Sequence, residues 1–242
     1  MSRARRVGGL VLAWIVLLAA APAADYVPAL TAAALAQTRE RVTYDGAYVR
    51  LAYPGGDVPA DRGVCTDVLI RAYRKLGADL QVLVHEDMKG HFALYPKNWG
   101  RRSPDANIDH RRVPNLMTFF SRHGETLPKS SRAADYAPGD IVAWDLGRGL
   151  THIGLLADRR GQDGRPLVVH NIGRGPQLED VLFDRTVIGH YRYRPRNPGV
   201  TPPRLPLHPR AAAGAWPRAA RGWGWSGRPW RSAPSRLPRR GC

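Results

Sequence analysis

Cysteine is scarce in this chain, since only Cys65 and Cys242 occur among its 242 residues. Two cysteines, one of which is the last residue, exclude the multi-disulfide framework of small secreted scaffolds. They also exclude zinc sites that are built from several thiolates. Thiol chemistry in the middle of the chain can therefore involve only Cys65.

Acidic residues are missing from both ends of the chain. Residues 1–24 contain three basic residues and no acidic one, and residues 195–242 contain ten arginines and no acidic one. The middle, residues 25–194, keeps 24 basic and all 20 acidic residues, so it carries only +4 of the formal charge of +17. We therefore expect one globular domain in the middle and no nucleic-acid partner for it.

A long apolar run occurs only near the N-terminus. Residues 10–20 are uninterruptedly apolar; three arginines precede them and the small residues of 21–23 follow. This order is typical of a secretory signal peptide, which we assign to residues 1–23, with a second candidate cleavage site at 34–36. The alternative is an uncleaved anchor, because residues 7–24 approach the length of a membrane-spanning helix. In both cases we expect a periplasmic or extracellular protein. It would contact the membrane only if the signal segment remains uncleaved.

The C-terminal segment, residues 195–242, contains ten prolines, ten arginines and four tryptophans. Proline at this density prevents helices and central strands. We predict a disordered Pro/Arg/Trp-rich tail. Interleaved arginine and tryptophan can bind nucleic acid or an anionic membrane surface. The simpler interpretation is an extension without a function of its own.

Two helices are predicted in the middle of the chain. Apolar residues recur at helical spacing in residues 64–77, where Asp61 is the expected N-cap and Gly77 the expected end. A second helix is predicted at residues 113–123.

The later part of the chain changes to short apolar runs that are separated by turns. Residues 24–41 are predicted to be a spacer, and residues 42–194 a single domain. Helices followed by a meander of strands indicate an α+β fold with an antiparallel sheet. The predicted strands are residues 141–144, 152–157, 166–170 and 187–193.

Cys65 lies at the start of the first predicted helix. A helix N-terminus stabilises a thiolate, which is the nucleophilic form of cysteine. His152 begins one predicted strand and His170 ends the next, so a hairpin would make the two histidines neighbours. One imidazole can then accept the thiol proton while the other orients it, as in a catalytic triad. The alternative is an inert, buried cysteine with two unrelated histidines.

The local sequences around these residues resemble known families. Cys65 lies in GVCTDVLIRAYRKLG, a Pro-Gly-Asp turn precedes IVAW, His152 lies in THIGLL and His170 in VVHNIG. This order is similar to that of NlpC-type, papain-like cell-wall cysteine peptidases. The chain also resembles a narrower family of bacterial envelope proteins, the domain of unknown function numbered 1287. The shared phrases are YPGGDVP, GVCTDV, NIDHRRVPNL, PGDIVAW, HIGLL and HNIG, between residues 42 and 193.

The resemblance implies a papain-like domain whose N-terminal catalytic helix packs on an antiparallel sheet. It assigns Cys65 as nucleophile and His152 as base, and leaves His170 or Asn171 as the third member. The NlpC-type nucleophile usually lies in Asp-Cys-Ser-Gly, whereas Cys65 is followed here by Thr66 and Asp67. About 60 residues also separate the helix from the strands, which is a long insertion.

The long insertion contains the segment DANIDHRR, which begins at Asp105. Its alternating oxygen ligands are reminiscent of a calcium loop, but the required glycine and the final glutamate are missing. We expect no metal or other cofactor, although Asp109, His110 and a strand histidine form an alternative metal site. Arginines in this segment can bind carboxylates of the protein or of a substrate. The residues expected to bind substrate are Asp67, Asp109, His110, Arg111 and Asn171.

These features predict an exported cysteine hydrolase that cleaves an amide or ester in the bacterial envelope. The resemblance implies a peptidoglycan peptide as the substrate class and main partner. The backbone N–H of Cys65 can supply one oxyanion donor. The first alternative is a non-catalytic envelope-binding module on the same fold. The second is a metal-dependent hydrolase that uses the histidines.

Overall fold

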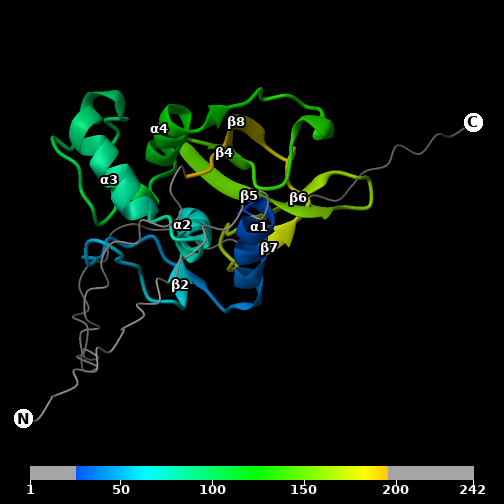
Figure 1. Cartoon of the computed structure of the whole chain (residues 1–242), viewed down its shortest axis with the longest axis horizontal. Helices are drawn as coiled ribbons and strands as arrows, with labels where there is room; N and C mark the ends of the chain where they lie inside the picture. Colours follow the sequence, from blue (N-terminus) through cyan, green and yellow to red (C-terminus); the bar gives the residue numbers. More distant parts are fainter. Residues whose placement is uncertain (1–25, 196–242) are drawn as a thin grey trace, which may run out of the picture. The chain divides into compact units, whose positions relative to one another are not determined.

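The computed structural model describes residues 26–195 (Figure 1). Helices precede an antiparallel sheet in this range, so the predicted α+β class is confirmed. The predicted signal peptide and nearly all of the predicted tail lie outside the described residues. The helices are α1 (Tyr26–Ala36), α2 (Cys65–Lys75), α3 (Leu80–His91) and α4 (Val113–His123).

The main sheet has six strands in the order β3-β8-β4-β5-β6-β7, and every neighbouring pair is antiparallel. A separate parallel pair, β1 (Thr43–Tyr44) with β2 (Arg62–Gly63), leads into α2. The four predicted strands correspond to β4, β5, β6 and β8. The strands of the main sheet are β3 (Glu125–Thr126), β4 (Ile141–Gly147), β5 (Leu150–Arg160), β6 (Pro166–His170), β7 (Gln177–Glu179) and β8 (Thr186–Arg192).

Helix α1 lies in the segment that we expected to be a spacer, and this expectation is wrong. Leu30 is 1% exposed and Ala34 is fully buried, and both belong to the main hydrophobic core. The helix packs against α2 and β5, as Figure 1 shows. Its sequence is apolar on all sides, so it lacks the polar face that marks an ordinary surface helix. The domain therefore begins before residue 42.

Helix α2 begins at Cys65 and ends before Gly77, whose φ of +84° is the left-handed conformation expected there. The predicted cap is wrong, because Val64 and not Asp61 occupies the N-cap position. Asp67 performs part of the capping instead, since its Oδ2 accepts a hydrogen bond from the Val64 N–H at 2.7 Å. The apolar stripe of the helix is buried against the sheet.

The sheet has apolar residues on both faces because strand side chains alternate. Ile153 and Leu155 of β5 pack in the core that contains α1 and α2. Leu156 faces the opposite way, into a smaller cluster with Trp144 of β4 and Val168 of β6. Within residues 26–195, no helix combines the length and apolar character needed to cross a bilayer. The sheet thus separates two layers, and the candidate site lies where β5 meets the start of α2.

Candidate active site

The thiol of Cys65 lies at the junction of α2 and β5. The side chain is 4% exposed, and backbone N–H groups of Ile153 and Thr66 are directed toward the sulfur. Burial is the main reason why the pKa of this thiol is raised to about 12. The resting thiol is therefore protonated at neutral pH, and any nucleophilic role requires a base.

The direction of the Ile153 N–H shows how the sulfur meets the sheet. Leu156 exchanges hydrogen bonds with residues 139 and 140 beside β4, so its N–H points toward β4. In an antiparallel sheet, residues an odd number apart direct their N–H groups to opposite neighbours, so that of Ile153 points toward β6. Strand β6 ends at His170, before it can pair with Ile153. The Cys65 sulfur takes the place of that missing strand partner, next to the peptide that joins His152 to Ile153.

The two strand histidines are direct neighbours, as the hairpin predicted. Nε2 of His152 and Nδ1 of His170 are 2.8 Å apart, and the residues are 3% and 2% exposed. His152 also stacks on Trp144, with ring centroids 5.5 Å apart. Burial lowers the pKa of His152 to about 3, so the imidazole is neutral at physiological pH. Because Nε2 is engaged with His170, Nδ1 is the nitrogen of His152 left for another partner.

Two residues at the site were missed by the sequence analysis. Glu179 of β7 accepts a hydrogen bond from His170, with Oε2 2.9 Å from Nε2. This hydrogen bond is the main reason why the pKa of Glu179 is lowered. Tyr44 of β1 hydrogen-bonds to the Cys65 side chain, and burial followed by the charge of Cys65 raises the pKa of its phenol. Neither residue lies in a motif; only strand pairing brings them to the site.

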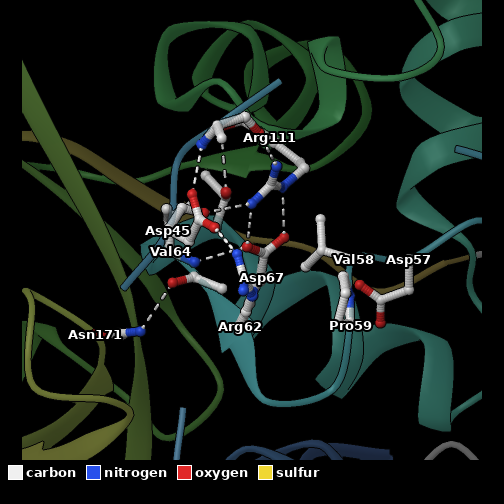
Figure 2. Close-up of polar contacts among 12 residues, drawn as sticks. Asp45, Asp57, Val58, Pro59, Arg62, Val64, Asp67, Arg111 and Asn171 are labelled. Carbon is white, nitrogen blue, oxygen red and sulfur yellow. Dashed lines mark hydrogen bonds and ion pairs between the residues drawn. The ribbon is translucent and has the colours of Figure 1, made fainter. Parts of the chain in front are cut away.

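Asp67 and Arg111, both predicted to bind substrate, form a buried ion pair (Figure 2). Arg111 donates from Nε and Nη2 to the two carboxylate oxygens of Asp67, each at 2.9 Å. The same guanidinium also donates to the backbone carbonyls of Asp45 and Ala47. The pair therefore fixes the 45–47 loop to the first turn of α2, and it is occupied by protein partners.

The other three residues predicted to bind substrate are also enclosed. Asp109, His110 and Asn171 are 3%, 2% and 1% exposed. Asp109 accepts hydrogen bonds from Arg112 and Asn115, whereas burial lowers the pKa of His110 to about 3 and leaves it neutral. The Asn171 amide donates to the Gly63 carbonyl at 3.4 Å, beside the start of α2 (Figure 2). All three therefore support the site from within and do not line its surface.

Comparison with known proteins assigns the family. The family profile described as "Domain of unknown function (DUF1287)" matches residues 31–193. The chain belongs to this family. It is also similar to the "Uncharacterized protein YijF" of Escherichia coli (strain K12). The two are 61% identical over 150 residues, which cover 62% of this chain and 73% of YijF. The family profile begins to match at residue 31, inside α1, as expected if that helix is part of the DUF1287 domain.

The DUF1287 domain thus brings His152, His170 and Glu179 into one hydrogen-bonded row and sets Cys65 beside the backbone of His152. Of the two candidates for the third position, His170 contacts His152, whereas Asn171 bonds to Gly63. Among residues 26–195, no three His, Cys, Asp or Glu side chains are grouped so that they could hold a metal ion. His152 lies on the sheet face of Trp144 and Leu156, whereas Cys65 belongs to the core on the opposite face. The backbone at residues 152–153 therefore lies between the thiol and the imidazole ring.

Proposed function

We propose that this DUF1287 domain is an exported cysteine hydrolase with a papain-like arrangement, which cleaves an amide or ester in the bacterial envelope. One observation carries the proposal. His152, which hydrogen-bonds to His170, is the residue directly before Ile153, whose N–H is directed toward the Cys65 sulfur. Thiol acyl transfer needs a nucleophile and a base within hydrogen-bond reach, and a cysteine that starts a helix packed on the strand of His152 supports such a pairing.

The chemistry follows from the atoms that are free to react. The Cys65 sulfur attacks the substrate carbonyl while its proton passes to Nδ1 of His152, whose other nitrogen is held by His170. The carbonyl oxygen becomes an oxyanion, and the N–H of Cys65 is a donor available at the helix start. His152 then gives the proton to the leaving group as the carbonyl re-forms, leaving a thioester. Water hydrolyses the thioester with His152 again acting as base, which restores the thiol.

Burial decides the resting state of this pair. Burial raises the pKa of the Cys65 thiol and lowers the pKa of the His152 imidazole, so both groups are neutral at rest. They therefore form no thiolate–imidazolium ion pair before substrate binds. Proton transfer and attack would then be coupled, and substrate binding would have to displace groups that cover the sulfur. Tyr44, which contacts the sulfur from β1 and is 37% exposed, is the natural group to move.

The substrate class is inferred from the expected location and from the resemblance to cell-wall peptidases. An exported hydrolase meets peptidoglycan first, and the peptide stems of peptidoglycan offer amide bonds. The same protected thiol also favours the second candidate, a non-catalytic module that binds wall peptides. A 4% exposed cysteine of raised pKa is what an inert core residue would look like.

Digestion of purified peptidoglycan separates the two candidates. The released fragments are analysed by mass spectrometry for the wild-type protein and for Cys65→Ala, which should keep the fold because alanine fits the helix start. We expect new peptide termini with wild type and none with Cys65→Ala. Equal cleavage by both proteins would reject the cysteine mechanism, and binding without cleavage by either would favour the module.

A further inference from the structure

Glu179 ends the row of hydrogen bonds that runs from His152 through His170. The register of β6 and β7 pairs Glu179 with Val168, so its side chain lies on the sheet face that carries His170. Oε2 accepts from His170 at 2.9 Å, and Oε1 accepts from Arg174 at 3.0 Å. The residue is partly shielded, with a side chain that is 29% exposed.

The chemistry of a carboxylate determines where the protons lie in this row. A carboxylate only accepts hydrogen bonds, so Nε2 of His170 must carry a proton. In neutral His170, Nδ1 then has a lone pair, and it must accept from a protonated Nε2 of His152. Neutral His152 is left with a lone pair on Nδ1, which is the form that can take a proton from a thiol.

We propose that Glu179 is a positioning residue that sets the tautomers of both histidines and offsets the positive charge formed when the Cys65 proton moves to His152. This inference rests on the proposed function. The other groups around the pair serve this purpose less well. Trp144 offers an uncharged indole to both histidines, and Arg174 is 76% exposed and opposes a second positive charge.

The charge of Glu179 acts on the step in which the proton leaves Cys65. That step gives the pair of histidines a net positive charge, which the nearby carboxylate stabilises. Without the carboxylate, His152 becomes a weaker base for the thiol.

The test uses iodoacetamide, which reacts with thiols and needs no knowledge of the substrate. The full chain carries Cys242→Ser, so that Cys65 is its only thiol, and the alkylation rate is followed by mass from pH 5 to 9. Glu179→Gln keeps a hydrogen-bond acceptor but removes the charge, and Glu179→Ala removes both. Asp180→Asn is the matched control, because it makes the same charge change one residue away at a side chain that pairs with Arg165.

We expect Glu179→Gln to lower the alkylation rate at neutral pH about tenfold, as for one pKa unit of base strength. Glu179→Ala should lower this rate further, whereas Asp180→Asn should follow wild type. A Glu179→Gln profile equal to that of wild type would overturn the inference. If His152→Gln slows alkylation while Glu179→Gln does not, only this inference fails; if neither does, the proposed function fails as well.

A second measurement on the wild-type protein does not depend on whether the variants fold. Nitrogen-15 NMR of the imidazoles at pH 8 should find His152 and His170 both protonated at Nε2. Protonation of either ring at Nδ1 alone would overturn the inference.

Discussion

Single residues at the start of α2 carry several functions at once. Asp67 accepts the Val64 N–H as part of the helix cap and also receives both donors of Arg111. The Arg111 and Asp67 side chains are each 2% exposed, so neither charge is solvated by water. A buried charge whose partner is removed is costly, which makes this pair the support for the position of Cys65.

Arg111→Met should therefore lower the free energy of unfolding by about 3–5 kcal/mol, because the Asp67 carboxylate would stay buried without its partner. Urea denaturation followed by circular dichroism measures this change. Arg62→Met is the control, since its pair with Asp45 has an arginine that is 55% exposed and should contribute less than about 1 kcal/mol. Equal effects of the two substitutions would contradict the role of the buried pair.

Sequence reasoning identified the residues whose chemistry is visible locally. Cys65 lies at a helix start, and His152 and His170 lie on strands that follow each other, so helix polarity and hairpin pairing were sufficient. Glu179 and Tyr44 were missed because each belongs to a strand of two or three residues, too short to show any periodicity. Asp67, Asp109, His110, Arg111 and Asn171 were expected to bind substrate. The other possibility for the arginines, that they bind carboxylates of the protein, is what the structure shows for Arg111 with Asp67. The sequence does not reveal which carboxylate an arginine will meet, because the partner lies far away along the chain.

At the scale of elements, α3 and α4 are joined by a single acidic residue. Asp87 of α3 accepts hydrogen bonds from Arg122 of α4 at 2.8 Å and from Tyr95 at 2.6 Å, and His123 is 2.9 Å away. Burial tends to raise the pKa of Asp87, but the hydrogen bonds from Arg122, Tyr95 and His123 outweigh it and hold the pKa well below its usual value.

The sign of the resulting pH dependence follows from the lowered pKa. The folded state binds the Asp87 proton more weakly than the unfolded chain, so its stabilising effect is present above about pH 4 and is lost as the pH falls below that value. Asp87→Asn should cost about 1–3 kcal/mol at pH 7, and less at pH 3, where the loss has begun but is not complete because the folded-state pKa lies lower still. Urea midpoints at the two pH values measure this difference, with Glu86→Gln as a neighbouring control. A difference in urea midpoint between wild type and Asp87→Asn that is the same at pH 7 and pH 3 would contradict this role of Asp87.

Elements were predictable where their sequence alternates clearly between apolar and polar residues. Helix α4 was predicted with its observed ends, and β6 with its observed bounds. Helix α3 was missed because its sequence, LQVLVHEDMKGH, mixes apolar and polar residues with little segregation. Helix α1 was missed for the opposite reason, since its uniform apolar composition continues that of the expected signal peptide.

At the scale of the whole molecule, α1 decides where a folded domain can begin. Its buried residues contact α2 and β5, the two elements that hold Cys65 and His152. Burial of Leu30 alone contributes about 1.5–3 kcal/mol. Cleavage at the second candidate site, after Ala36, would remove this helix from the core, whereas cleavage after Ala23 would leave it intact.

If the protein is exported as proposed, we therefore expect the mature chain to begin at Ala24 and not at Gln37. Intact-mass measurement of the protein from the envelope fraction identifies the first residue. A chain that starts at Gln37 should also unfold at a lower urea concentration than one that starts at Ala24. An exported protein that begins at Gln37 and is equally stable would contradict the place of α1 in the core.

Transfer of the proton from the Cys65 thiol to His152 is the central step of the proposed function. Iodoacetamide alkylation of the Cys242→Ser protein, compared with the same protein carrying His152→Gln, tests it most directly. We expect the His152→Gln protein to be alkylated at least about tenfold more slowly near neutral pH, since the buried thiol would have lost its base. Equal rates for the two proteins at every pH from 5 to 9 would contradict it.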